Sequence, residues 1–248
     1  INNCTGTDFG FFRMYKNPIS SAIVVISQTL NYYAGGNVLY APVKVYASKQ
    51  AQKEDKALTK DVDYTLTYEN NVNAGTAKVT VTGIGSYGGT KVATYKIQPR
   101  TLKDVSYDYL NEETFEYTGK AITPTITLTL GSYELVEGKD YTVKYKNNVN
   151  VASSTSKNAP TVVITGKGNF KDSVSTTFSI GVKELREDMI TTSRVKYTGK
   201  AVKTKVIVKD GDKVLKAGKD YTIGKYSNNI ESSDYAEVLI TGKGNYTG

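Results

Sequence analysis

The chain has 248 residues, of which 39% are hydrophobic and 23% are charged, values that are usual for a globular protein. It contains no histidine, which excludes imidazole acid–base catalysis and imidazole metal ligands. A single cysteine, Cys4, excludes an internal disulfide. We therefore expect no enzymatic activity, no catalytic or metal site, and no cofactor.

The net charge is +8, with lysines spread along the whole sequence. A solvated basic surface explains this spread better than a nucleic-acid site, so no nucleic-acid partner is expected. An anionic cell wall or a glycan would also suit such a surface. The longest apolar run, residues 22–26, is far shorter than the ~20 residues of a membrane helix, so membrane insertion is not expected either.

Residues 5–14 read TGTDFGFFRM and predict a strand. They fit the same slot as two later alternating runs, at residues 91–97 and 173–180, each of which follows a recurring turn motif. Residues 1–22 are accordingly assigned to the closing strand of a preceding repeat. The apolar side chains available in this strand are Phe9, Phe11, Phe12 and Met14.

Three motifs recur in one order, with spacings of 76 to 84 residues. The first begins at Tyr33, Tyr117 and Tyr197, the last two reading YTGK. The second begins at residues 63, 140 and 220 with Asp-Tyr-Thr and ends in an Asn-Asn pair. The third begins at residues 79, 162 and 238 and contains the turn TGxG.

These motifs divide the chain into three repeats of about 80 residues, at 23–100, 101–181 and 182–248. The third repeat ends before its closing strand. Short alternating runs between turn signals are typical of an immunoglobulin-like (Ig-like) β-sandwich. The predicted fold is all-β, with three tandem sandwiches in an extended rod.

Several local features are expected to be structural. The Asn-Asn pairs favour left-handed turns, and the Gly-x-Gly of the third motif favours a tight turn, since no helix follows it. The acids at 63, 140 and 220 predict a cap or turn because they recur at equivalent strand starts. Residues 210–212 predict a hairpin turn in place of a calcium loop, and an extra residue in the third repeat predicts a β-bulge at Gly224.

Two insertions, at residues 48–56 and 151–160, are expected to be solvated loops. Eight tyrosines occur in one repeat only, and four of them are candidates for an aromatic binding surface. They are Tyr107, Tyr109, Tyr133 and Tyr235.

The sequences Y-T-G-K, G-K-D-Y-T-V-K-Y-K-N-N and V-L-I-T-G-K-G-N-Y-T-G resemble tandem Ig-like repeats of Gram-positive, chiefly clostridial, surface and secreted proteins. The resemblance covers nearly the whole chain, although the first repeat departs most, with Y-A-G-G at its first motif. It implies an extracellular, wall-associated setting and a modular protein, without implying an activity.

Three functions stay open from the sequence. The first is a structural stalk or adhesin segment of a cell-surface protein, in contact with its neighbouring repeats. The second is a subunit of an extracellular fibre, in which residues 1–16 of one molecule complete the third repeat of another copy, head to tail. The third is a carbohydrate-binding accessory module that uses the repeat-specific tyrosines.

Overall fold

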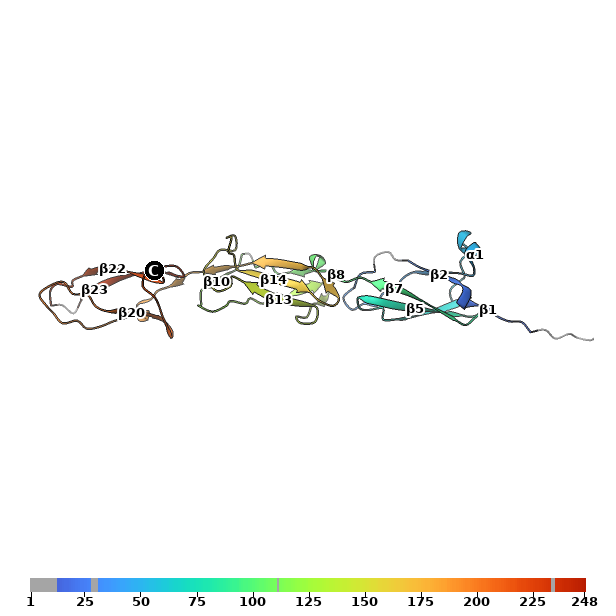
Figure 1. Cartoon of the computed structure of the whole chain (residues 1–248), viewed down its shortest axis with the longest axis horizontal. Helices are drawn as coiled ribbons and strands as arrows, with labels where there is room; N and C mark the ends of the chain where they lie inside the picture. Colours follow the sequence, from blue (N-terminus) through green and yellow to red (C-terminus); the bar gives the residue numbers. More distant parts are fainter. Residues whose placement is uncertain (1–12, 28–30, 111, 233–234) are drawn as a thin grey trace, which may run out of the picture. The chain divides into compact units, whose positions relative to one another are not determined.

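The computed structural model describes residues 13–27, 31–110, 112–232 and 235–248 (Figure 1). The fold is all-β with many small sheets, as expected for the fold class. Within these ranges the helical elements are one short α-helix, α1 (Lys49–Lys53), and three 3-10 turns, η1 (Ile19–Ser21), η2 (Leu102–Asp104) and η3 (Glu187–Met189). None of the helices in the described ranges is long and apolar enough to span a membrane.

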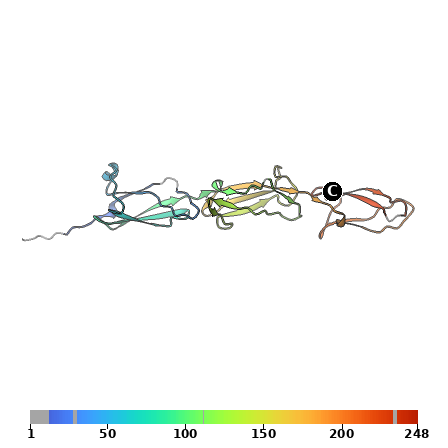
Figure 2. The same ribbon diagram turned by 180° about the vertical axis from the view of Figure 1, so that it is seen from behind.

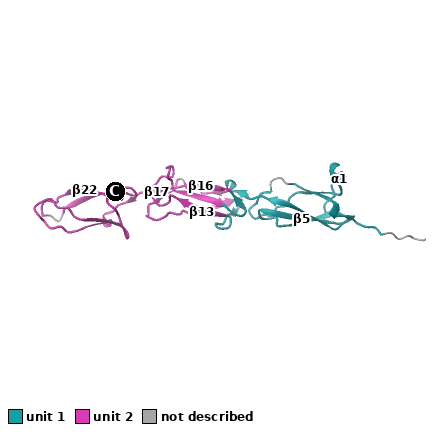
Figure 3. Cartoon of the chain, in the orientation of Figure 1, with its two compact units in different colours: residues 1–104, 130–140, 166–171 teal, residues 105–129, 141–165, 172–248 magenta. Residues whose placement is uncertain are grey.

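The chain forms two compact units (Figure 3). Unit 1 comprises residues 1–104, 130–140 and 166–171, and unit 2 comprises 105–129, 141–165 and 172–248. Unit 1 therefore holds the first repeat and one end of the second, while unit 2 holds the rest of the second and the third. The repeat boundaries expected from the sequence stay predictions, and the words first, second and third repeat keep the ranges given above.

The first repeat contains two main sheets. Strands β2 (Ile23–Ile26) and β3 (Val43–Tyr46) pair antiparallel. Strands β4 (Tyr64–Glu69), β5 (Gly75–Gly83) and β7 (Thr90–Ile97) form an antiparallel sheet with β5 in the middle. Alternating side chains of β5 are buried, as the period of a strand with one face on a core requires.

The buried core of this repeat starts before β2. Ile19 and Ala22 belong to the same fully buried cluster as Val45, Tyr64 and Val81. The sequence assigns residues 1–22 to a preceding repeat, whereas Ile19 and Ala22 pack against core residues of the first repeat. The 3-10 turn at 19–21 places them there. Three residues are too few to show a periodic pattern, so the sequence did not reveal this turn.

The second repeat reproduces this arrangement. Strands β13 (Tyr141–Lys146), β14 (Thr161–Gly166) and β16 (Ser173–Thr177) form the three-stranded sheet, again in the order first, middle, closing. The closing segment continues into β17 (Ser179–Gly181), which pairs parallel with β10 (Thr114–Glu116). Strands β9 (Ser106–Tyr107), β11 (Leu128–Leu130) and β12 (Tyr133–Glu134) form another small sheet.

The third repeat has fewer paired strands. Strands β22 (Tyr221–Ser227) and β23 (Glu237–Gly242) form a sheet of only two strands within the described residues. Strands β19 (Ile190–Thr192), β20 (Val206–Asp210) and β21 (Lys213–Val214) form the other sheet. Figure 2 shows the same chain from behind, with the β22–β23 pair at its C-terminal part in orange and red.

A short parallel ladder lies at or just before the start of each repeat. β1 (Asn17–Pro18) pairs with β6 (Tyr87–Gly88), β8 (Arg100–Thr101) with β15 (Phe170–Lys171), and β18 (Lys183–Glu184) with β24 (Tyr246–Thr247). The third sequence motif thus folds back on the segment that enters its own repeat. We call this end of each repeat its entry end, and the end where the closing strand finishes its exit end.

The expected turns are confirmed. Asn70, Asn147 and Asn228 all have φ of 55°, in the left-handed region. The second asparagine of each pair has a role that the sequence did not reveal, because its side-chain amide donates to a backbone carbonyl across the sandwich. These bonds join Asn71 to Leu39 at 3.2 Å, Asn148 to Ile122 at 2.9 Å, and Asn229 to Val202 at 2.8 Å.

The recurring acids cap turns, as predicted. A carboxylate oxygen accepts from the backbone N–H four residues earlier in each repeat: Asp63 from Thr59, Asp140 from Val136, and Asp220 from Lys216, at 2.8 to 3.0 Å. The predicted hairpin joins β20 to β21, and the register shift between Ile223 and Tyr226 confirms the bulge around Gly224.

The first insertion is not the simple loop that was expected. Residues 49–53 form α1, and the Ser48 hydroxyl accepts the Ala51 N–H at 3.1 Å as an N-cap. The Asp55 carboxylate then accepts the Tyr46 hydroxyl at 2.6 Å, which attaches the helix to β3. The polar composition of this segment concealed one turn of helix with a serine cap.

Candidate functional site: the joints between repeats

Two places in the structure join the exit end of one repeat to the entry end of the next. We call them joint 1, between the first and second repeats, and joint 2, between the second and third. Joint 1 lies wholly within unit 1, and joint 2 lies wholly within unit 2. Both are built from the first and third sequence motifs, so the recurring residues are those that meet at the joints.

Joint 1 contains an aromatic pair. Tyr33 of the first motif and Phe170 of the third lie with ring centroids 5.4 Å apart at 79°, an edge-to-face contact. Tyr133 also makes an edge-to-face contact with Tyr33, with ring centroids 6.1 Å apart at 85°. Tyr33 and Phe170 are each about 2% exposed, so the pair is a small buried core in its own right.

An asparagine fixes joint 1 at its side. The Asn169 side-chain oxygen accepts the Ala74 backbone N–H at 2.8 Å, while its Nδ2 donates to the Asn73 side-chain oxygen at 3.0 Å. The Arg100 guanidinium adds a bond of 3.3 Å to the Tyr33 carbonyl. The side chain of Asn169 therefore satisfies a donor and an acceptor of the neighbouring repeat at once.

Joint 2 repeats both features with different residues. Tyr117 and Tyr246 have ring centroids 5.4 Å apart at 81°. Asn245 accepts the Val151 N–H at 2.9 Å and donates to the Asn150 side-chain oxygen at 3.1 Å. The asparagine latch, meaning this pair of bonds made by Asn169 and by Asn245, is the same in geometry at the two joints.

Joint 2 also holds a charged network. Lys213 Nζ donates to the Tyr117 hydroxyl at 3.1 Å and to the Tyr246 hydroxyl at 3.4 Å, and it lies about 5.5 Å from both ring centroids. The Asp210 carboxylate accepts from the Tyr246 hydroxyl at 3.1 Å and from Lys183 Nζ at 2.7 Å. The cation of Lys213 thus lies near the faces of both rings, an arrangement that is attractive through cation–π interaction.

These contacts set the protonation of the network. Burial alone raises the pKa of Asp210, but the hydrogen bonds from Lys183 and Tyr246 outweigh it, so that its pKa is lowered. The hydrogen bond to Tyr117 is the main cause that raises the pKa of Lys213. Burial raises the pKa of Tyr246 to about 12 and, in joint 1, that of Tyr33 to about 12. All four groups therefore keep their ordinary charge at neutral pH.

The four candidate surface tyrosines do not share one role. Tyr107 and Tyr109 lie together, with ring centroids 4.8 Å apart, and Tyr109 is largely exposed. Tyr133 is part of joint 1, where its hydroxyl donates to Asp140 at 2.8 Å. Tyr235 is strongly exposed and precedes β23 in the third repeat. A glycan site made by these side chains stays a prediction.

The candidate strand-donor residues lie at the edge of the described structure. Phe9, Phe11 and Phe12 fall outside the described residues, and Met14 is 85% exposed. The sequence did not single out Asn169 and Asn245, which looked like turn residues.

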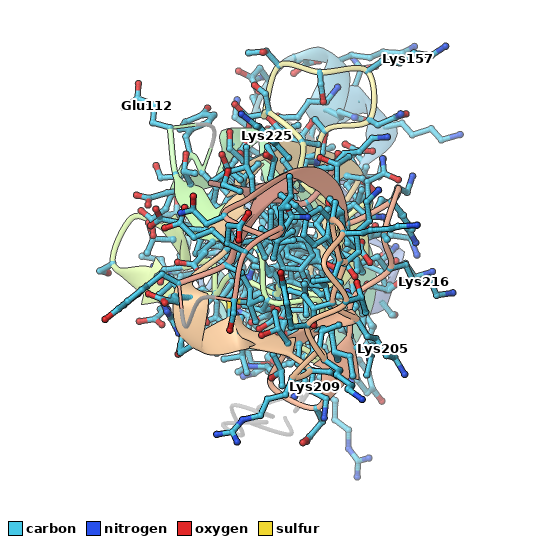
Figure 4. The ribbon with its side chains drawn as sticks, turned by 90° about the vertical axis from the view of Figure 1, so that its left-hand side faces the viewer. Glu112, Lys157, Lys205, Lys209, Lys216 and Lys225 are labelled. Carbon is cyan, nitrogen blue, oxygen red and sulfur yellow. The ribbon has the colours of Figure 1, made fainter. Side chains whose placement is uncertain are left out.

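Much of the basic charge faces solvent. In the third repeat, Lys203 and Lys205 lie just before β20 and Lys209 lies within it, and all three are exposed to solvent. Figure 4 shows Lys205 and Lys209 extending away from the ribbon. Among the described residues, no group of three or more cysteine, aspartate or glutamate side chains could hold a metal ion.

No protein-family model matches the chain, and no curated protein matches its sequence. Among solved structures, it is similar to the protocadherin GammaB4 extracellular domain, at 14% identity and a TM-score of 0.22. The match covers 82% of this chain and 40% of the other, so the chain spans less than half the length of that structure. What the chain does is therefore inferred from its own residues.

Proposed function

We propose that this chain is a structural stalk or adhesin segment of a Gram-positive bacterial cell-surface protein, built from tandem Ig-like sandwiches in an extended rod. The observation that supports it most is the asparagine latch, which occurs with the same two bonds at two successive joints. A spacer needs to hold successive repeats in a defined order and direction. The recurring Asn169 and Asn245 supply contacts that suit this need.

A stalk also accounts for which residues recur among the three repeats and which differ between them. Recurring residues form cores, turns and joints, while the loop insertions and exposed lysines differ between repeats. We propose an extracellular location and no catalytic role, since a stalk requires neither an active site nor a cofactor. The exposed lysines suit contact with an anionic cell wall.

Small-angle X-ray scattering of the chain tests the rod. The expected maximum dimension is roughly 100 Å, if each sandwich spans about ten strand residues at ~3.3 Å each. Replacing Asn169 and Asn245 by alanine together should broaden the distance distribution while leaving the circular dichroism spectrum unchanged. A compact particle, or a distribution that the double variant leaves unaltered, would argue against a stalk held by these joints.

A further inference from the structure

One sheet of the third repeat carries lysines on its outer face. Its middle strand is β20, where Val208 is fully buried, so that the alternate positions Lys205 and Lys209 face solvent. The buried Leu215 donates its N–H to the Val208 carbonyl at 2.9 Å, and the next residue, Lys216, is exposed beside them. We call Lys205, Lys209 and Lys216 the lysine cluster. Figure 4 shows these three side chains extending from the ribbon on the same side.

The members of the lysine cluster are close enough to act together. Lys205 and Lys209 are separated by about 13 Å along the chain, at ~3.3 Å of strand per residue. The register of β20 and β21, continued by two residues, places Lys216 opposite Ile207, between the other two lysines and about 4.8 Å across the sheet. These separations are comparable to the Debye length of about 8 Å at physiological ionic strength, so the potentials of the three ammonium groups add.

Little acidic charge in this part of the repeat offsets the cluster. Strands β19, β20 and β21 contain one acid, Asp210, whose carboxylate already accepts from Lys183 and Tyr246. The sequence from 189 to 209 contains no aspartate or glutamate. Among the described residues, no member of the cluster forms an ion pair. The positive potential is therefore available to a partner outside the chain.

The fold itself does not require lysine at these positions. The second repeat has Thr125, Thr129 and Val136 at the same positions, 80 residues earlier in each case. Thr125 faces solvent there too, so exposure is a property of this face of the sandwich. Threonine favours strands, whereas lysine disfavours them and like charges on one face repel. Lysines that protect a sheet from aggregation lie on edge strands, but β20 is a middle strand.

The side chains of this face favour a flexible polymer that carries phosphate groups. Lysine binds phosphate as a point charge, whereas the planar fork of arginine suits an anion held in a fixed orientation, and the cluster contains lysine alone. The cross-strand neighbours of Ile207 and Lys209 are Thr191 and Val214. Because none of these neighbours is aromatic, the bases of a single-stranded nucleic acid would find no ring to stack on.

We infer that the lysine cluster binds a linear, phosphodiester-linked polymer of the cell wall, with its ammonium groups on successive phosphates. The inference rests on the proposed cell-surface setting and assigns the wall contact to one face of the third repeat. Such a contact is electrostatic and releases counterions from the polymer, so its affinity falls as salt rises. The corresponding face of the second repeat, with threonine at two of the three positions, does not bind.

Isothermal titration calorimetry of the whole chain with synthetic poly(glycerol phosphate) tests the inference. The cluster variant combines Lys205→Thr, Lys209→Thr and Lys216→Val, which are the residues of the second repeat and should leave the fold intact. Its affinity should be roughly tenfold or more below that of the wild type at about 50 mM salt. The slope of log K against log salt should also become shallower by about 2, since each lost phosphate contact removes about 0.7.

A second triple variant separates the cluster from net charge. Lys144→Thr, Lys157→Thr and Lys225→Thr remove the same number of positive charges from exposed positions outside the cluster. Lys144 and Lys225 lie in β13 and β22, which belong to other sheets. This control variant should bind poly(glycerol phosphate) as the wild type does. Circular dichroism and small-angle X-ray scattering should be the same for both variants and the wild type.

Two comparison polymers identify the kind of anion. Hyaluronate carries carboxylates only, and oligothymidylate carries phosphodiesters with bases; both should bind more weakly than poly(glycerol phosphate). Equal affinity for either polymer, equal losses in the cluster and control variants, or no binding at low salt overturns the inference. A chain that scatters as a rod but binds no polymer leaves the stalk standing, whereas a compact particle counts against the stalk whatever it binds.

Discussion

Lys213 of joint 2 occupies the hairpin position that Tyr133 occupies in joint 1. Both follow the turn glycine of a short hairpin by two residues, and both contact the aromatic pair of their joint. One joint thus uses a third aromatic ring where the other uses a cation. The two joints share the asparagine latch and differ in what supports the rings, so they should respond differently to pH and salt.

Removing the latch should weaken a joint without unfolding a repeat. Asn245→Ala leaves the Val151 N–H without its side-chain acceptor, at a cost of about 1 to 3 kcal/mol. Calorimetry should show that the third repeat unfolds at a lower temperature than in the wild type. Its unfolding should also be less coupled to that of the second repeat. Ser86→Ala, at the equivalent position of the first repeat, is the control and should leave the melting profile unchanged.

Replacing Lys213, the cation of joint 2, should destabilise this joint. The loss of stability should depend on which side chain replaces the lysine. Lys213→Ala removes the hydrogen bonds to both tyrosine hydroxyls and leaves Lys183 as the cation still bonded to Asp210. Lys213→Tyr supplies the ring that joint 1 uses and should recover part of the loss. Urea unfolding of the wild type, Lys213→Ala and Lys213→Tyr measures their free energies of unfolding. A tyrosine variant less stable than the alanine variant would contradict the prediction.

Joint 2 should lose stability in acid. The pKa of Asp210 is lowered in the fold, so its contribution is complete above the unfolded value near 4 and is lost as pH falls through the folded value. Unfolding free energies of the wild type and Asp210→Asn should therefore differ at pH 7 and converge in acid. A difference that persists unchanged to low pH would mean that the carboxylate charge is not the source.

The buried joint tyrosines should ionise late. The pKa of Tyr33 and that of Tyr246 are raised to about 12, so their stabilising contribution is complete below pH 10 and lost as pH rises through 12. Absorbance of phenolate in a pH titration should show a late step beyond that of exposed tyrosines. Tyr246→Phe should shrink that step.

One glycine of each third motif has no room for a side chain. A Cβ built on Gly242 would lie 2.7 Å from backbone atoms of Thr247, where β24 returns. Gly242→Ala should therefore unfold the third repeat at lower temperature than the wild type. Gly224→Ala, where the nearest atoms are 3.4 Å away, should be tolerated far better in the same repeat.

The turns of this fold could be read from the sequence because their chemistry is local. Left-handed asparagines, capping aspartates and the bulge near Gly224 each depend on residues within a few positions. The joints could not be read in this way. The contact between Asn245 and Val151 joins residues 94 apart, and nothing in either neighbourhood specifies the other. The core role of Ile19 could not be read from the sequence either, because it follows from packing alone.

The closing segment of the second repeat has a mechanical consequence. Because β17 runs parallel to β10, tension that draws the chain out past Gly181 acts along their shared ladder. Hydrogen bonds loaded in this direction share the force and must break together, unlike the rungs of a hairpin, which open one at a time. In the proposed stalk, the second repeat would extend under tension only after that whole ladder gave way at once.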